Sequence, residues 1–121
     1  MSKQDPDPKA VVGTLNQILE AELAGVVRYT HYSFMVFGPN RIPIVSFFRA
    51  QATEGMTHAI AMGEKITAYG GHPTIRVENP PESGKHDVRS LLQESLDFER
   101  SGVELYRQLL DMAGGDIALE E

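Results

Sequence analysis

Apolar residues recur at helical spacing over most of the chain, and this pattern predicts three long helices. The helices are expected at about residues 8–37, 41–69 and 87–112. Their apolar stripes comprise Leu15, Ile18, Val26 and Tyr29 in the first, Ile44, Phe47, Gln51 and Ala61 in the second, and Val88, Leu92, Ser95, Val103, Tyr106 and Leu110 in the third. No segment alternates as a half-buried strand does, apart from a short stretch at 74–77, so the chain is expected to be all-α.

Glycine and proline mark the expected helix ends. Asp7-Pro8 has the form of an N-cap followed by a proline in the first turn. The break at 38–40 and the glycine pairs at 70–71 and 114–115 end successive helices. Asp116 could cap a fourth helix, which has only begun when the sequence ends, and we expect the natural chain to continue.

The segment 72–86 is rich in proline and charged residues and is expected to connect the second and third helices. Each of the first two helices is roughly 45 Å long at about 1.5 Å per residue. The connector, when extended, spans roughly 50 Å at about 3.3 Å per residue, which is enough to return along the whole bundle. The three-residue break between the first two helices predicts an antiparallel pair, and the long connector allows the second and third helices to run parallel.

Length and composition narrow the class of protein. The 121 residues suffice for one domain, and the absence of cysteine excludes disulfides, thiolate metal sites and iron–sulfur clusters. A net charge of -6 argues against nucleic acid or an anionic membrane as a partner. The polar N-terminus lacks the core of a signal peptide, and no apolar run is expected to approach the length of a membrane span, so a cytoplasmic location is the default.

Four polar residues lie where the helical period predicts the apolar faces. They are Glu22 in the first helix, Glu54 and His58 in the second, and Glu99 in the third. Ionised carboxylates in an apolar interior are costly and repel one another, so a bound cation or protons must offset them. Carboxylates and imidazole suit iron, and the cores of helix bundles build di-iron sites from such residues. The pattern therefore predicts a di-iron carboxylate site.

A plainer interpretation exists for each residue taken alone. A glutamate at the edge of an apolar face usually extends to water, and a glutamate and histidine four residues apart usually form a surface pair. The coincidence of three such carboxylates in one small chain favours the metal site. Other candidates are expected at the surface. Glu20, Glu64, Glu94 and Glu104 lie outside the apolar stripes, His31 and His86 lack comparable carboxylate partners, and His72 lies at a helix end.

Several segments resemble the helices of bacterioferritins. The resemblance is carried by residues 15–23 with Tyr29, 52–59, 63–66, the turn at 70–73, and 96–100, and it covers nearly the whole chain. It implies a ferritin-like four-helix bundle with a long crossover between helices two and three. The fourth helix of that bundle is missing or only begun in this sequence.

The resemblance also implies roles for the candidate residues. Glu22 and Glu99 would be terminal ligands of the two irons. Glu54 would bridge the irons, His58 would ligate the first one, and Tyr29 would be a hydrogen-bond or redox neighbour. The implied activity is that of a ferroxidase, which oxidises Fe(II) with oxygen or peroxide once the fourth helix is supplied. Iron storage would take place in a homo-oligomer, from a dimer up to a 24-subunit shell.

The sequence departs from the bacterioferritin pattern at three points. Gly55 stands where the usual Glu-x-x-His motif has its glutamate, and Glu54 is four residues before His58. Both spacings lie on one helical face, so Glu54 can substitute with altered reach. Met56 falls where bacterioferritins bind haem b between subunits, although a plain interface methionine is the alternative. The incomplete fourth helix normally supplies a bridging glutamate and a second Glu-x-x-His pair.

Other functions remain open. If the chain ends at Glu121, the prediction reduces to one metal held by Glu22, Glu54 and His58. The three helices would then leave an apolar groove, which favours a non-catalytic assembly subunit that docks onto a partner helix. A di-iron enzyme for an organic substrate, such as a hydroxylase, ranks lowest because the chain is short for an added pocket. The absence of cysteine excludes a rubredoxin domain of the rubrerythrin type.

Overall fold

The structure, a computed structural model, describes residues 7–113. It consists of α1 (Pro8–Met35), α2 (Arg41–Ala68) and α3 (Val88–Ala113), with no strand among the described residues. The prediction of an all-α chain is confirmed, and the ends of the helices differ from the expected ones by at most two residues. The expected start of a fourth helix at Asp116 lies outside the described residues.

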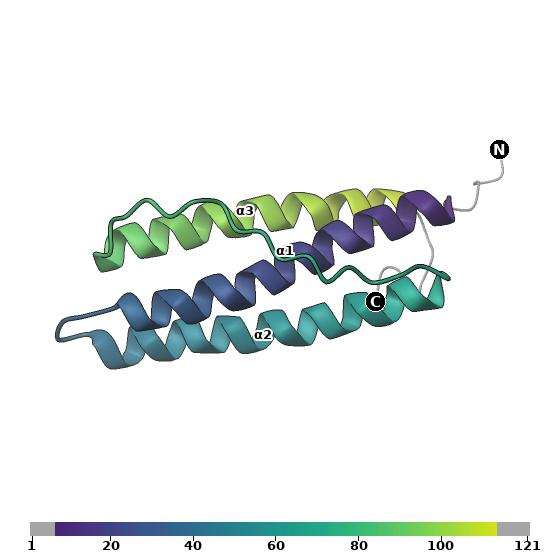
Figure 1. Cartoon of the computed structure of the whole chain (residues 1–121). Coiled ribbons are helices and arrows are strands. Elements are labelled where there is room, and N and C mark those ends of the chain that lie inside the picture. Colours follow the sequence, from purple (N-terminus) through teal and green to yellow (C-terminus); the bar gives the residue numbers. More distant parts are fainter. Residues whose placement is uncertain (1–6, 114–121) are drawn as a thin grey trace.

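α1 is the central helix, and it packs against both α2 and α3. α1 runs antiparallel to the other two helices, which point in the same direction (Figure 1). The segment between α2 and α3 returns along the whole bundle, as the length of the connector predicts. This long crossover makes the topology ferritin-like.

Local signals set the helix ends. The carboxylate of Asp7 accepts a hydrogen bond from the backbone N–H of Lys9 at 3.1 Å and so caps α1. α2 ends where Gly70 adopts a φ of 77°, and the N–H of Gly71 donates to the carbonyl of Ile66 at 2.9 Å. This is a Schellman-type termination, for which glycine in the left-handed region is the favoured residue.

The core consists of two apolar clusters that follow one another along the bundle. One cluster joins the first half of α1 to the ends of α2 and α3 and contains Val11, Leu15, Ile18, Leu19, Ala59, Met62, Ile66, Leu109 and Ala113. The other joins the end of α1 to the beginnings of α2 and α3 and contains Tyr29, Tyr32, Val36, Val45, Phe48, Ala52 and Leu91. Between them α1 carries Glu22 and Gly25, so polar residues interrupt the core at mid-length.

α2 buries a different stripe from the predicted one. Its buried residues are Val45, Phe48, Ala52, Gly55, Ala59, Met62 and Ile66. The predicted stripe lies beside this one, and its Phe47 is 47 % exposed. α3 likewise exposes Leu92, Val103 and Leu110. The reason is that, within residues 7–113, no helix covers the second apolar faces of α2 and α3.

The central position of α1 also explains its unusual apolarity. By length and composition alone α1 could cross a membrane, since an 18-residue window has a mean hydropathy of 1.3. The expectation that no apolar run approaches the length of a membrane span is therefore wrong. Because α1 packs against α2 and α3 on different sides, apolar residues occupy more than one of its faces, as in many core helices.

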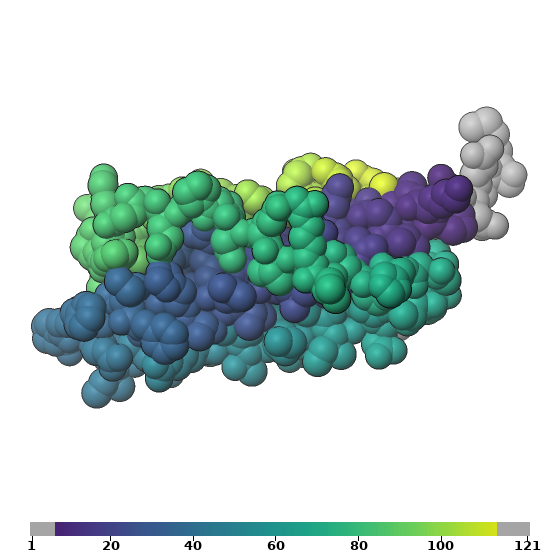
Figure 2. All heavy atoms as spheres, in the orientation of Figure 1, coloured from purple at the N-terminus to yellow at the C-terminus, as the bar shows by residue number. Residues whose placement is uncertain are grey.

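The crossover makes side-chain contacts with α1 at several points along its length. Near its start, the side-chain amide of Asn16 donates to the carbonyl of His72 at 3.1 Å and accepts from the N–H of Thr74 at 2.9 Å. Further along, Arg28 donates to the side chain of Asn79 at 3.0 Å. The crossover consequently covers part of α1, as the space-filling view shows (Figure 2).

Candidate metal centre

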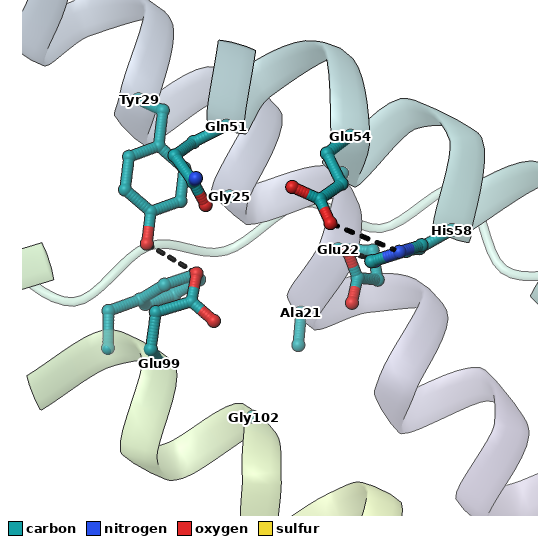
Figure 3. Close-up of a pocket in the computed structure, with 11 residues that line it drawn as sticks. Ala21, Glu22, Gly25, Tyr29, Gln51, Glu54, His58, Glu99 and Gly102 are labelled. Carbon is teal, nitrogen blue, oxygen red and sulfur yellow. Dashed lines mark hydrogen bonds and ion pairs between the residues drawn. The ribbon is translucent and has the colours of Figure 1, made fainter. Parts of the chain in front are cut away.

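A cavity of about 110 Å³ lies at mid-length of the bundle, between the two apolar clusters. Its wall comes from all three helices (Figure 3). The polar residues that line it are Glu22 and Tyr29 from α1, Gln51, Glu54 and His58 from α2, and Glu99 from α3. The structure therefore brings the four predicted metal ligands and Tyr29 to one space, and their roles remain predictions.

Glu22 is the most enclosed of the three carboxylates, with a side chain that is 16 % exposed. Tyr106 of α3 donates a hydrogen bond to Glu22 Oε1 at 2.9 Å. The second oxygen, Oε2, lies 3.4 Å from His58 Nδ1 on α2. Glu22 thus links the central helix to both of its neighbours.

Glu99 of α3 also accepts a hydrogen bond from a tyrosine of another helix, in this case α1. Tyr29 of α1 donates a hydrogen bond to Glu99 Oε1, drawn as a dashed line in Figure 3. The ring of Tyr29 stacks on Phe48 at a centroid distance of 6.2 Å and meets Phe98 edge-on at 6.3 Å. These aromatic contacts restrict the ring and fix the direction in which its hydroxyl points.

The two hydrogen bonds form a reciprocal pair. In α1, Tyr29 follows Glu22 by seven residues, and in α3, Tyr106 follows Glu99 by the same spacing. Seven residues are close to two helical turns, so each glutamate and tyrosine share a face. Because α1 and α3 are antiparallel, the tyrosine of each helix meets the glutamate of the other.

Glu54 and His58 form the exposed side of the cavity. Their side chains are 60 % and 48 % exposed, and His58 Nε2 lies 3.9 Å from Glu54 Oε1. The expectation that both residues, together with Glu99, lie on a buried face is therefore wrong, since only Glu22 is largely enclosed. They belong to the faces of α2 and α3 that no described helix covers.

Two glycines bring the helices close together at the cavity. A Cβ at Gly25 would lie 3.3 Å from the ring of Phe98 on α3. A Cβ at Gly55 would lie 3.4 Å from the backbone oxygen of Glu22 and 3.6 Å from its Oε2. A Cβ at Gly25 would require the Phe98 ring to shift slightly, whereas a Cβ at Gly55 would make ordinary contacts and leave no free space beyond it. Gly55, which replaces the glutamate of the usual spacing, therefore allows α2 to approach Glu22.

The electrostatics of the cavity favour the gain of positive charge. Burial raises the pKa of Glu22 above its usual value, against the hydrogen bond from Tyr106 and the nearby His58, and the charge of Glu99 raises it further. Burial and the neighbouring carboxylates also raise the pKa values of Tyr29 and Tyr106. Both phenols therefore keep their protons and act as hydrogen-bond donors at neutral pH. A proton or a cation would relieve the repulsion between the carboxylates.

The donor set fits an iron ion. Carboxylate oxygens and an imidazole nitrogen are suitable ligands for iron, and here they line one cavity. Within residues 7–113, no three carboxylate or imidazole groups converge closely enough to hold an ion as they stand. Binding would require a change of rotamer at Glu54 or Glu99, and such a change disturbs little packing because both side chains are exposed.

The pattern of apolar residues assigned Tyr106 and Gln51 only to packing, whereas both belong to the site. The signal for Tyr106 is the seven-residue spacing from Glu99, which repeats that of Glu22 and Tyr29. Met56 does not line the cavity and is 43 % exposed. Its role in haem binding remains a prediction.

Comparison with solved structures identifies relatives of the same fold. A ferritin-like diiron-carboxylate protein from Bacillus anthracis str. Ames matches with a TM-score of 0.85 and 27% identity, over 99% of this chain and 83% of that one. The bacterioferritin-related dodecameric thioferritin of Bacteroides fragilis matches with a TM-score of 0.85 and 22% identity, over 95% and 73% of the two chains. Rhodobacter capsulatus bacterioferritin, described with a metal-free dinuclear site and haem iron, matches with a TM-score of 0.77 and 25% identity, over 96% of this chain and 72% of that one.

Comparison of the sequence with family models gives the same result. No curated protein sequence matches significantly. The model of the ferritin-like domain matches residues 12–121, which is nearly the whole chain. The match agrees with the three-helix arrangement, the long crossover and the carboxylates that line the central cavity. This chain therefore belongs to the ferritin-like domain family.

Proposed function

We propose that this chain binds iron in the central cavity and oxidises Fe(II), in the service of iron storage or detoxification. The observation that carries the proposal is that Glu22, Glu54, His58 and Glu99 line one cavity. The raised pKa of Glu22 supports it, because burial and a neighbouring carboxylate create a demand for positive charge. The descriptions of the Bacillus anthracis and Rhodobacter capsulatus relatives, which name diiron-carboxylate and dinuclear sites, add support.

The reaction needs metal ligands and a supply of protons. Two Fe(II) ions lose one electron each, while one oxygen molecule gains two electrons and two protons to become hydrogen peroxide. With peroxide as the oxidant, the same two electrons and two protons give two water molecules. The carboxylates and the imidazole of His58 would hold the iron. Tyr106 and Tyr29 would keep Glu22 and Glu99 in place by donating their hydrogen bonds.

We further propose that the chain works as a homo-oligomer. It exposes large apolar side chains on the outer faces of its helices, among them Phe34 on α1, which is 58 % exposed, and Ile60 on α2, which is 60 % exposed. The relative from Bacteroides fragilis is described as dodecameric. Native mass spectrometry would test this directly, and a monomer at micromolar concentration would contradict it.

The test of the main proposal is the rate of Fe(II) oxidation under air. Glu22→Ala and His58→Ala remove proposed ligands from α1 and α2, and Glu54→Ala tests the residue with unusual spacing. Each variant should lower the rate by roughly tenfold or more. Glu64→Ala is the matched control, because Glu64 is an exposed glutamate of α2 outside the cavity. Equal rates for wild type and the ligand variants would contradict the proposal.

A non-catalytic assembly subunit is the second candidate. The open faces of α2 and α3, on which Phe47, Leu92 and Val103 are exposed, favour it. Elemental analysis of the purified protein separates the two functions. Near-stoichiometric iron, zinc or manganese supports the metal site, whereas the absence of all three supports the assembly role.

A further inference from the structure

Arg28 is a buried cation that lies outside the cavity of the metal centre. Its side chain is 6% exposed. The guanidinium donates from Nη1 to Tyr32 Oη at 2.5 Å and from Nε to Asn79 Oδ1 at 3.0 Å, and the carbonyl of Pro80 accepts from Nη2. Nη1 also lies 3.6 Å from Glu94 Oε2, so the buried charge is paired. Arg28 thereby contacts α1, α3 and the crossover at once.

Glu94 completes this network from α3. It accepts hydrogen bonds from Tyr32 Oη at 3.0 Å and from the backbone N–H of Ser83 at 2.7 Å. Its side chain is only 19% exposed, so the expectation that Glu94 is solvated is wrong. The guanidinium of Arg28 and the hydroxyl of Tyr32, both on α1, provide the partners that allow this carboxylate to be enclosed.

The network reaches the metal centre through two aromatic rings. The guanidinium carbon of Arg28 lies 5.5 Å from the centroid of Phe98 and 5.7 Å from that of Tyr32. Both rings in turn contact Tyr29, with centroid distances of 6.3 Å for Phe98 and 6.0 Å for Tyr32. Tyr29 donates the hydrogen bond to Glu99, which directly follows Phe98 in α3.

We propose that Arg28 is a positioning residue of the metal centre, which fixes the rotation of α3 on α1 so that Glu99 meets Tyr29. Arginine suits this task because its planar fork of donors binds several partners in one fixed geometry, which lysine cannot reproduce. The part of the proposal that concerns metal affinity rests on the proposed function. The part that concerns the contact between Tyr29 and Glu99 does not.

The experiment compares Arg28→Lys with Arg49→Lys. Arg49 is a matched control, because it also links two helices, through Ser33 at 3.2 Å and the ring of Phe34 at 5.9 Å, but it does not contact Phe98 or Tyr32. The first readout is the NMR signal of the Tyr29 ring in metal-free protein with 13C-labelled tyrosine. With four tyrosines in the chain, Tyr→Phe variants assign the signals. The second readout is the dissociation constant of Co(II), followed by its absorption spectrum.

Arg28→Lys should shift the Tyr29 signal and raise the dissociation constant of Co(II) by about tenfold, the low end for loss of an outer-shell partner. Arg49→Lys should change neither. If Arg28→Lys lowers the melting temperature but leaves the Tyr29 signal in place, Arg28 only stabilises the fold and the proposal is overturned.

Glu94→Gln provides the same test should Arg28→Lys fail to fold. The glutamine removes the charge that faces Arg28 and keeps one of the two acceptor oxygens, so Ser83 and Tyr32 can no longer both donate to it as they do to Glu94. A shifted Tyr29 signal supports the proposal, and an unchanged signal overturns it. If wild-type protein binds no metal, the proposed function fails, whereas the Tyr29 signal of the metal-free protein still decides the role of Arg28.

Discussion

The hydroxyl of Tyr106 lies 2.9 Å from Glu22 Oε1, and it donates a hydrogen bond from α3 to a carboxylate on α1. With the reciprocal bond from Tyr29 to Glu99, each of these carboxylates is oriented by the helix opposite its own. A change in the packing of α3 on α1 therefore alters both carboxylates together. The site depends on this helix pair as much as on the identity of the ligands.

Tyr106→Phe should weaken metal binding without unfolding the protein. The variant keeps the ring and removes the hydrogen bond that holds Glu22, so we expect the dissociation constant of Co(II) to rise about tenfold. Tyr69→Phe is the control, because Tyr69 does not line the cavity. Titrations that give the same affinity for both variants would show that the Tyr106 hydroxyl has no part in the site.

Glu22→Gln should stabilise the metal-free protein at neutral pH. Burial raises the pKa of Glu22 above its usual value in the folded state, so the stability linked to its proton is complete below the pKa of the unfolded chain and is lost as pH rises through the folded pKa. A neutral glutamine still accepts from Tyr106 and avoids this loss. The gain in melting temperature should therefore be present at pH 7 and vanish near pH 4. A gain that is constant with pH would contradict the assignment.

The sequence predicts the helices of this fold well because their ends carry local signals. Asp7 caps α1, and the glycines after Tyr69 close α2, in each case through contacts within a few residues. The crossover follows from the length of the connector, since only a long segment can return along a helix of this size. These features depend on neighbours in the chain, which the sequence displays directly.

The buried faces and the supporting network could not be predicted in the same way. α2 has two adjacent apolar stripes, one through Phe48 and one through Phe47, and only the packing of α1 decides which of them is buried. The pairing of Arg28 with Glu94 joins residues that are distant in sequence and depends on the rotation of two helices. Hydrophobic periodicity contains no information about that rotation.

Gly71→Ala should destabilise the end of α2. A Cβ at this position would lie 2.6 Å and 2.8 Å from the two methyl carbons of Val12, so we expect a loss of about 1–3 kcal/mol from overpacking. Gly13→Ala, whose Cβ would meet nothing within 4 Å in the second turn of α1, should instead add about 0.5–1 kcal/mol. Urea denaturation measures both changes.

A double substitution tests whether contact with Val12 causes the loss of stability in Gly71→Ala. Val12→Ala removes the methyl groups that the new Cβ would meet, so Gly71→Ala should cost less in that background than in wild type. If the cost is the same in both backgrounds, the clash with Val12 is not its cause.

Asn16→Asp should loosen the start of the crossover at neutral pH. The aspartate keeps an acceptor for the N–H of Thr74 but places a charged oxygen where the amide donates to the carbonyl of His72. We expect a loss of about 1–3 kcal/mol at pH 7. The loss should shrink below about pH 4, where a protonated aspartate regains a donor. Gln17→Glu, at an exposed neighbouring position, makes the same change of charge. A similar loss from that control would point to net charge instead of the hydrogen bond.

The central position of α1 has a consequence for the order in which the molecule opens. α1 and α2 are joined by a short turn and packed along their length, whereas α3 is joined by the crossover and packs mainly on α1. Amide hydrogens of α3 should therefore exchange with solvent faster than those of α1 and α2, through partial opening of α3 alone. Glu99 would leave the site in each such event, while Glu22, Glu54 and His58 stay together. Bound metal, by joining α3 to the other two helices, should slow this exchange most strongly in α3.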